Sequence, residues 1–137
     1  MAEGKVLTGA GLRGQVAGKT ALSTVGKSGA GLTYRGYDVQ DLAENCQFEE
    51  VAYLIFFGEL PTTEQLAAYK AKLKSLRQLP QALKEVLERI PADSHPMDVM
   101  RTGVSMLGNL ETEKSFDEQQ DVADRILATL PAIICYW

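Results

Sequence analysis

The stretch Phe48-Glu-Glu-Val-Ala-Tyr-Leu-Ile-Phe-Phe-Gly-Glu-Leu-Pro-Thr-Thr-Glu-Gln65 carries a helix, its end and the start of a second helix. Apolar residues recur at helical spacing up to Phe57, and Gly58 follows as a typical helix-terminating glycine. Thr62 can cap the next helix, with Gln65 placed to complete a capping box. Because only a few residues separate the two helices, the stretch predicts helices that pack against each other.

The segments on either side carry the same signals. The helix that begins after Thr62 is expected to continue to about Leu76. Four more helices are expected. The first is capped by Asp38 and runs to Cys46, the second runs from Pro80 to Ile90, and the third starts at Ser94 or His95 with Pro96 in the first turn. The fourth begins near Asp117 and includes Val122, Ile126, Leu127 and Leu130. Helices joined by such short connections predict an all-α domain.

The first part of the chain is different, because residues 1–36 are rich in glycine and show no helical period. Two short β-prone runs, Thr20–Val25 and Gly31–Arg35, flank the turn-like segment Gly26–Gly31 and predict a small hairpin. The expected organisation is therefore an N-terminal arm with a β-hairpin over residues 1–36, followed by a helical part over residues 37–137.

Composition excludes several classes of protein. A net charge of −4 and a pI near 5.0 argue against a general nucleic-acid-binding protein, which would carry a basic patch. The two cysteines, Cys46 and Cys135, lie too far apart in sequence for a disulfide framework, so we expect two buried free thiols in a reducing cytoplasm. The longest apolar run, Leu130–Trp137, is too short to span a bilayer, so no membrane association is expected.

The same apolar run stands at the end of the chain without a polar tail, whereas domains usually end in exposed polar residues. We therefore expect a truncated or cleaved chain. An apolar surface deprived of its partners should follow, and the residues expected on it are Val104, Met106, Leu107, Leu127, Ile133 and Ile134.

Two glycine motifs imitate nucleotide-binding loops. Gly9-Ala-Gly-Leu-Arg-Gly14 matches a dinucleotide fingerprint, and Ala21-Leu-Ser-Thr-Val-Gly-Lys-Ser28 matches a relaxed P-loop, but neither is followed by a helix. His95 is the single histidine, and its place beside Pro96 favours a helix cap over a catalytic base. With one histidine and two distant cysteines, the sequence predicts no metal site.

Several strings, in this order, resemble the citrate synthase family. They are Thr20-Ala-Leu-Ser-Thr-Val25, Leu32-Thr-Tyr-Arg-Gly-Tyr37, Phe48-Glu-Glu-Val-Ala-Tyr-Leu54, Gly58-Glu-Leu-Pro61 and Ser94-His-Pro-Met-Asp-Val-Met-Arg-Thr-Gly103. The last string is more similar to the bacterial branch that makes 2-methylcitrate than to the large mitochondrial enzymes. The resemblance implies the first part of the enzyme's large, helical domain, from about Leu12 to Trp137.

The resemblance also implies an activity and its partners. A family member condenses an acyl-CoA with oxaloacetate, needs no cofactor because the CoA thioester is a substrate, and forms a homodimer. A carboxylate deprotonates the acyl-CoA, and two histidines polarise the two carbonyls. In the family these residues lie beyond the position that corresponds to residue 137, so we expect no catalytic residue in this chain.

One residue of the chain is a candidate for substrate binding by the same resemblance. It is Lys74, in Lys72-Leu-Lys-Ser-Leu-Arg77, which matches a basic position associated with the substrate site in some small bacterial members. Lys keeps the charge of the Arg found in other members but lacks its fork of donors. The alternative is a solvated lysine on a charged helix face.

Two alternatives remain open for the chain as a whole. The acyl donor can be acetyl-CoA, which would make the activity citrate synthesis, because the residues that choose between acyl groups are expected beyond residue 137. The chain can also be a helical interaction module without catalytic function, although such a module would be expected to end in a polar segment.

Overall fold

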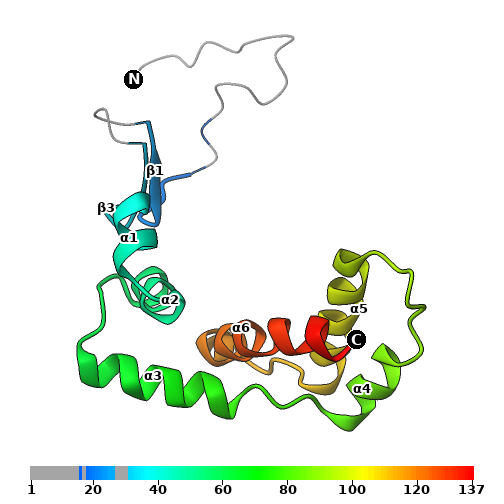
Figure 1. The fold of residues 1–137 in the computed structure, drawn as a ribbon. Helices are drawn as coiled ribbons and strands as arrows, with labels where there is room; N and C mark the ends of the chain where they lie inside the picture. Colours follow the sequence, from blue (N-terminus) through cyan, green and yellow to red (C-terminus); the bar gives the residue numbers. More distant parts are fainter. Residues whose placement is uncertain (1–15, 17, 27–30) are drawn as a thin grey trace, which may run out of the picture.

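The computed structural model describes residues 16, 18–26 and 31–137. These residues form a small sheet followed by a run of helices (Figure 1). The strands are β1 (Ser23–Val25), β2 (Leu32–Tyr34) and β3 (Tyr37–Asp38). The helices are α1 (Val39–Asn45), α2 (Phe48–Phe57), α3 (Thr63–Ser75), α4 (Gln81–Leu87), α5 (Pro96–Leu110), the 3-10 helix η1 (Phe116–Glu118) and α6 (Gln119–Tyr136). The expected helical fold with a small N-terminal β element is confirmed.

The sheet is antiparallel in the order β1-β2-β3, so the expected hairpin is present and a third strand joins it. The third strand arises because Arg35 and Gly36, both with positive φ, make a two-residue turn between the paired residues Tyr34 and Tyr37. The boundary expected between residues 36 and 37 falls at the start of β3. The Gly9–Gly14 match, and residues 27–30 of the expected turn, lie outside the described residues.

The expected helix caps are confirmed at the first three helices. Asp38 accepts a hydrogen bond from the backbone N–H of Gln40 at 2.8 Å. Gly58 ends α2 in the left-handed conformation, with φ of 92°. Thr62 and Gln65 exchange the two hydrogen bonds of a capping box, at 3.2 and 2.8 Å.

Two helix bounds differ from expectation. Helix α4 ends at Leu87 instead of Ile90, because the N–H groups of Arg89 and Ile90 bond three residues back and Pro91 disfavours helix at the preceding residue. Helix α6 begins at Gln119 because the turn before it tightens into η1. No helix of the described residues is long and apolar enough to cross a membrane.

The main core lies where α4, α5 and α6 meet. It consists of Leu83, Leu87, Val99, Leu107 and Ile133, all nearly or fully buried. Leu107 and Ile133 therefore keep their partners inside this chain, and the expectation that they lose them is wrong. They are covered because Gly103 lets α5 approach Ile133 of α6 closely.

A second, smaller cluster joins α3 to α6. Tyr69 and Leu73 of α3 pack there on Ala128 of α6. In Figure 1 α3 passes α2 at one end and reaches α6 at the other, so α3 links the half of the molecule with the sheet to the half with α5.

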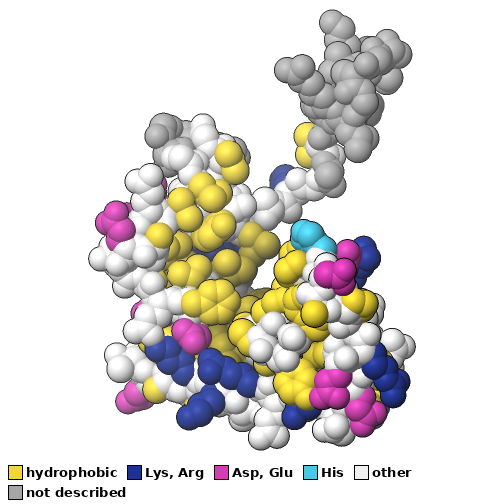
Figure 2. Space-filling model, turned by 45° about the vertical axis from the view of Figure 1, so that its right-hand side comes forward, with side chains coloured by type: hydrophobic (Ala, Val, Ile, Leu, Met, Phe, Trp, Pro, Cys, Tyr) yellow, Lys and Arg dark blue, Asp and Glu magenta, His cyan; other side chains and the backbone are white. Residues whose placement is uncertain are grey.

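Large apolar side chains nevertheless remain on the surface. Figure 2 shows them gathered in a hollow between the two halves of the molecule. Phe48 of α2 is 65% exposed, and Phe57 is 46% exposed.

We expect the isolated 137-residue chain to self-associate, because uncovered apolar patches of more than a few hundred Å² favour association. Light scattering over a dilution series checks this, and Phe48→Ser with Phe57→Ser should shift the chain towards monomer. Replacing the exposed Arg101 by Ser is the matched control and should leave association unchanged. A monomer at all concentrations would contradict the expectation.

Candidate functional site

The candidate site is the cationic edge of α3. Lys70 and Lys74 lie on α3, and Arg77 follows its end at the same helical spacing. The three side chains have different surroundings. Lys70 donates a hydrogen bond to the side-chain oxygen of Gln47 before α2. The Lys74 side chain is exposed, and its ammonium makes no hydrogen bond or ion pair within the part of the chain that the structure describes.

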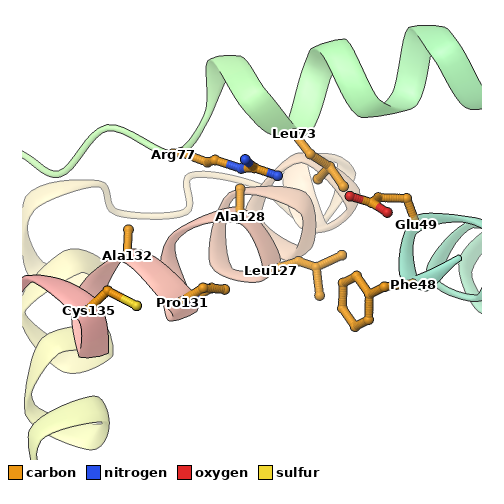
Figure 3. A pocket seen from close by; sticks show the side chains of 9 residues that line it. All are labelled: Phe48, Glu49, Leu73, Arg77, Leu127, Ala128, Pro131, Ala132 and Cys135. Atoms are coloured by element: carbon orange, nitrogen blue, oxygen red, sulfur yellow. The ribbon is translucent and has the colours of Figure 1, made fainter.

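Arg77 reaches a pocket of about 400 Å³ between α2, α3 and α6 (Figure 3). The pocket is lined by Phe48, Glu49, Leu73, Arg77, Leu127, Ala128, Pro131, Ala132 and Cys135. Arg77 and Glu49 are its charged lining residues, and in Figure 3 Glu49 enters from α2 and Arg77 from the segment just after α3. The pocket thus has apolar walls with one cation and one anion at its edge.

A buried carboxylate lies on the other side of α3. Asp124 of α6 is fully buried and accepts hydrogen bonds from the Tyr69 hydroxyl at 2.8 Å and from the Lys72 ammonium at 2.7 Å. Gln120 adds a third hydrogen bond at 3.2 Å. Burial, and then the hydrogen bond to Asp124, raise the pKa of Tyr69, so its hydroxyl stays protonated as a donor.

Lys72 also donates to Asp121 at 2.8 Å. Its hydrogen bonds to Asp121 and Asp124 raise the pKa of its ammonium. The Lys72 ammonium is therefore paired with carboxylates of α6, whereas the ammonium of Lys74, two residues further along the helix, is available to bind an external anion.

Arg125, the next residue of α6, holds the segment that follows α3. Its guanidinium donates to the carbonyls of Leu76 and Gln78, the latter at 2.9 Å. The same guanidinium also donates two hydrogen bonds to the Glu111 carboxylate, from Nη2 at 2.7 Å and from Nε at 2.8 Å. These hydrogen bonds lower the pKa of the Glu111 carboxyl. Arg125 thereby fixes the backbone on both sides of Arg77.

The remaining candidates have structural surroundings. His95 caps α5, and its Nδ1 accepts a hydrogen bond from the N–H of Met97 at 3.2 Å. Cys46 is half-buried and Cys135 is exposed, so the expectation of two buried thiols is wrong for Cys135, which lines the pocket. Among the described residues, no group of three or more His, Cys, Asp and Glu side chains is arranged to hold a metal ion.

The sequence interpretation did not single out Arg77, Asp124 or Arg125. A signal exists for Asp124, which stands three and four residues before Leu127 and Ala128 and so shares the apolar face of α6. A carboxylate on such a face needs a buried partner. Arg77 and Arg125 carry no comparable signal, because a single arginine on a charged helix is ordinarily solvated.

Comparison with known proteins places these elements in a family. Residues 11–137 match the family model described as citrate synthase, C-terminal domain. The chain is 78% identical to a 2-methylcitrate synthase of Shewanella oneidensis over all 137 residues, which make up 36% of that protein. It is 42% identical to a 2-methylcitrate synthase of Corynebacterium glutamicum, over 90% of this chain and 33% of the relative.

Solved structures agree with this assignment. The citrate synthase of Thermotoga maritima superposes with a TM-score of 0.80 at 30% identity, over 93% of this chain and 34% of that one. The citrate synthase of Thermoplasma acidophilum, solved in ternary complex with carboxymethyl coenzyme A and oxaloacetate, also gives 0.80, at 28% identity over 90% of this chain and 33% of that one. The chain thus spans about a third of the length of its relatives. By its family match, its relatives and its fold, the chain belongs to the citrate synthase family.

Proposed function

We propose that this chain is the N-terminal part of a bacterial 2-methylcitrate synthase, which condenses propanoyl-CoA with oxaloacetate and water to give 2-methylcitrate and CoA. The observation that carries the proposal is the 78% identity over the whole chain to a protein of that name. The reaction belongs to the breakdown of propanoate in the cytoplasm, and it needs no cofactor besides the CoA thioester substrate.

The chemistry divides between this chain and the part of the enzyme beyond it. A carboxylate removes a proton from the α-carbon of the acyl-CoA, the resulting enolate attacks the ketone carbon of oxaloacetate, and water then cleaves the thioester. The carboxylate and the two histidines that polarise the carbonyls are expected beyond residue 137. This chain supplies a helical frame for them and the cationic edge of α3.

The acyl group is the main open choice. A relative from Mycobacterium tuberculosis named 2-methylcitrate synthase and one from Mycolicibacterium smegmatis named citrate synthase are both 42% identical to this chain, so identity at this level does not separate the two substrates. The 78% relative favours propanoyl-CoA.

We expect kcat/KM of the complete enzyme to be higher with propanoyl-CoA than with acetyl-CoA. A thiol-release assay with oxaloacetate and each acyl-CoA in turn measures the ratio. A ratio in favour of acetyl-CoA would make citrate synthesis the function, and no turnover of either substrate would favour the interaction module. Analytical ultracentrifugation of the same preparation tests the proposed homodimer.

Lys74 is the proposed substrate-binding residue of this chain. Its ammonium is free of partners among the described residues, and both substrates carry negative charge in carboxylates or phosphates. We expect Lys74→Ala in the complete enzyme to raise KM roughly five-fold, which corresponds to about 1 kcal/mol for an edge contact. The free energy of unfolding should change little, because the side chain is exposed.

Steady-state kinetics with each substrate varied in turn measure this effect and identify the substrate that Lys74 contacts. Lys114→Ala is a matched control, since Lys114 is also exposed but lies in the loop before α6. Identical KM values in Lys74→Ala and in the unaltered enzyme would make Lys74 a solvated surface lysine.

A further inference from the structure

Two adjacent residues of α6 hold α3 and the segment after it at successive points. Asp124 binds Tyr69 and Lys72 within α3, through contacts of 2.8 and 2.7 Å. Arg125 binds the carbonyls of Leu76 and Gln78 just beyond α3. The anchored positions therefore run from residue 69 to residue 78.

The cationic residues lie between these anchors. Lys74 stands between Lys72 and Leu76, and Arg77 stands between Leu76 and Gln78. Neither Lys74 nor Arg77 is itself bound by Asp124 or Arg125. Each is nonetheless fixed in position by held neighbours on both sides.

The anchors also set the rotation of α3 about its axis. At about 100° per residue, Lys72 flanks the buried side chains of Tyr69 and Leu73 on one edge, whereas Lys74 flanks them on the other. A helix held at Lys72 and Tyr69 cannot turn without moving Lys74. The apolar contact of Leu73 with the small Ala128 side chain is less directional, and it would tolerate a range of rotations.

In the pair of Lys72 with Asp124 the lysine side chain is 42% exposed and the carboxylate is fully buried. An ion pair with a buried member is a poor source of stability, because removing a charge from water costs about as much as the attraction returns. The best-attested role of such pairs is to select one arrangement of packed helices. Asp124 fits this role, since it is fully buried and would lose its two donors from α3, Tyr69 and Lys72, if α3 rotated. Only Gln120, on the same helix as Asp124, would remain as a donor.

We propose that Asp124 and Arg125 are positioning residues that hold two members of the cationic edge of α3, Lys74 and Arg77, in the orientation that receives the negatively charged substrate. The proposal rests on the proposed function, because Lys74 must contact substrate for its orientation to affect the reaction. Asp124 and Arg125 act through α3 and do not touch substrate themselves.

The test in the complete enzyme is a double-mutant cycle between Asp124→Asn and Lys74→Ala. Asp124→Asn keeps the shape of the side chain and removes its charge. It should raise KM roughly five-fold, as Lys74→Ala does, with kcat within about two-fold, because it acts through the same edge contact. The increase in KM of the double variant should be no larger than that of either single variant. KM effects that multiply, or an unchanged KM in Asp124→Asn beside a raised one in Lys74→Ala, would overturn the proposal.

A distance measurement tests the orientation without substrate. A spin label on Lys74→Cys and a second on Ser105→Cys of α5, with the native cysteines replaced by serine, report where the α3 edge points. The distance distribution should be narrow with Asp124 and broad with Asp124→Asn. An equally narrow distribution in both proteins would overturn the proposal, whatever the kinetics. A broad distribution with a neutral Lys74→Ala would instead reject the substrate role of Lys74 alone.

Two further variants distinguish a loss of helix orientation from a general loss of stability. Tyr69→Phe removes one donor to Asp124 and keeps the ring, so it should broaden the same distribution more mildly. Thr129→Val is the matched control, because Thr129 is fully buried on α6 but bonds only to carbonyls of its own helix. It should lower stability without changing KM or the distance distribution.

Discussion

On its own, the 137-residue chain should release no CoA thiol from propanoyl-CoA and oxaloacetate. Its single histidine, His95, caps α5 and accepts a backbone hydrogen bond, so it is not arranged as a base for substrate. Enzymes typically accelerate their reactions by about 10⁶-fold or more, and we expect a chain whose catalytic groups lie beyond residue 137 to lose nearly all of this.

The measurement is the thiol-release assay at high protein concentration, with the complete enzyme as the positive control. Each preparation should be compared with one that carries His95→Asn, which keeps a cap on α5. Turnover by the 137-residue chain above the level of a contaminating complete enzyme would contradict the expectation. Turnover that His95→Asn abolishes would make His95 a catalytic residue.

The helices of this chain were predictable because their ends are encoded locally. Asp38, Thr62 and His95 cap helices through hydrogen bonds to residues two or three positions away. Gly58 ends α2 in a conformation that glycine adopts without strain. A signal of this kind is complete within a few residues, so the sequence alone is sufficient to find it.

The third strand and the end of α4 were not predicted, because the local sequence at these two places gives no sign, or a misleading one, of the observed structure. Non-glycine residues rarely adopt positive φ, so Arg35 gave no sign of a turn with Gly36. The residues after Leu87 continue the helical pattern of apolar positions, but Pro91 and three-residue hydrogen bonds end the helix before them.

The candidate site could be predicted only in part, because its geometry comes from contacts distant in sequence. Lys74 was found by resemblance, and its role in substrate binding remains a prediction. The contacts that frame it join residues about fifty positions apart, as in the hydrogen bonds of Asp124 with Tyr69 and Lys72. Helical periodicity shows which face of α6 is buried, but not which helix covers it.

The contact between α5 and α6 should be the most sensitive point of the fold, and Gly103 tests it. A Cβ atom added at Gly103 would lie 2.6 Å from Cγ2 of Ile133, whose side chain is fully buried and branched close to the backbone. We expect Gly103→Val to lower the free energy of unfolding by about 2–3 kcal/mol, the cost of overpacking a close helix contact. Urea unfolding followed by circular dichroism measures the change.

Gly108 supplies the matched control on the same helix, since a Cβ atom there would meet no atom within 4 Å. Gly108→Ala should raise the free energy of unfolding by roughly 0.5–1 kcal/mol, because alanine favours a helix over glycine. Alanine at Gly103 has the same helix preference, but its Cβ atom would meet Ile133. Gly103→Ala should therefore lower the free energy of unfolding, whereas Gly108→Ala raises it. Equal effects of alanine at the two positions would mean that α5 and α6 do not meet at Gly103.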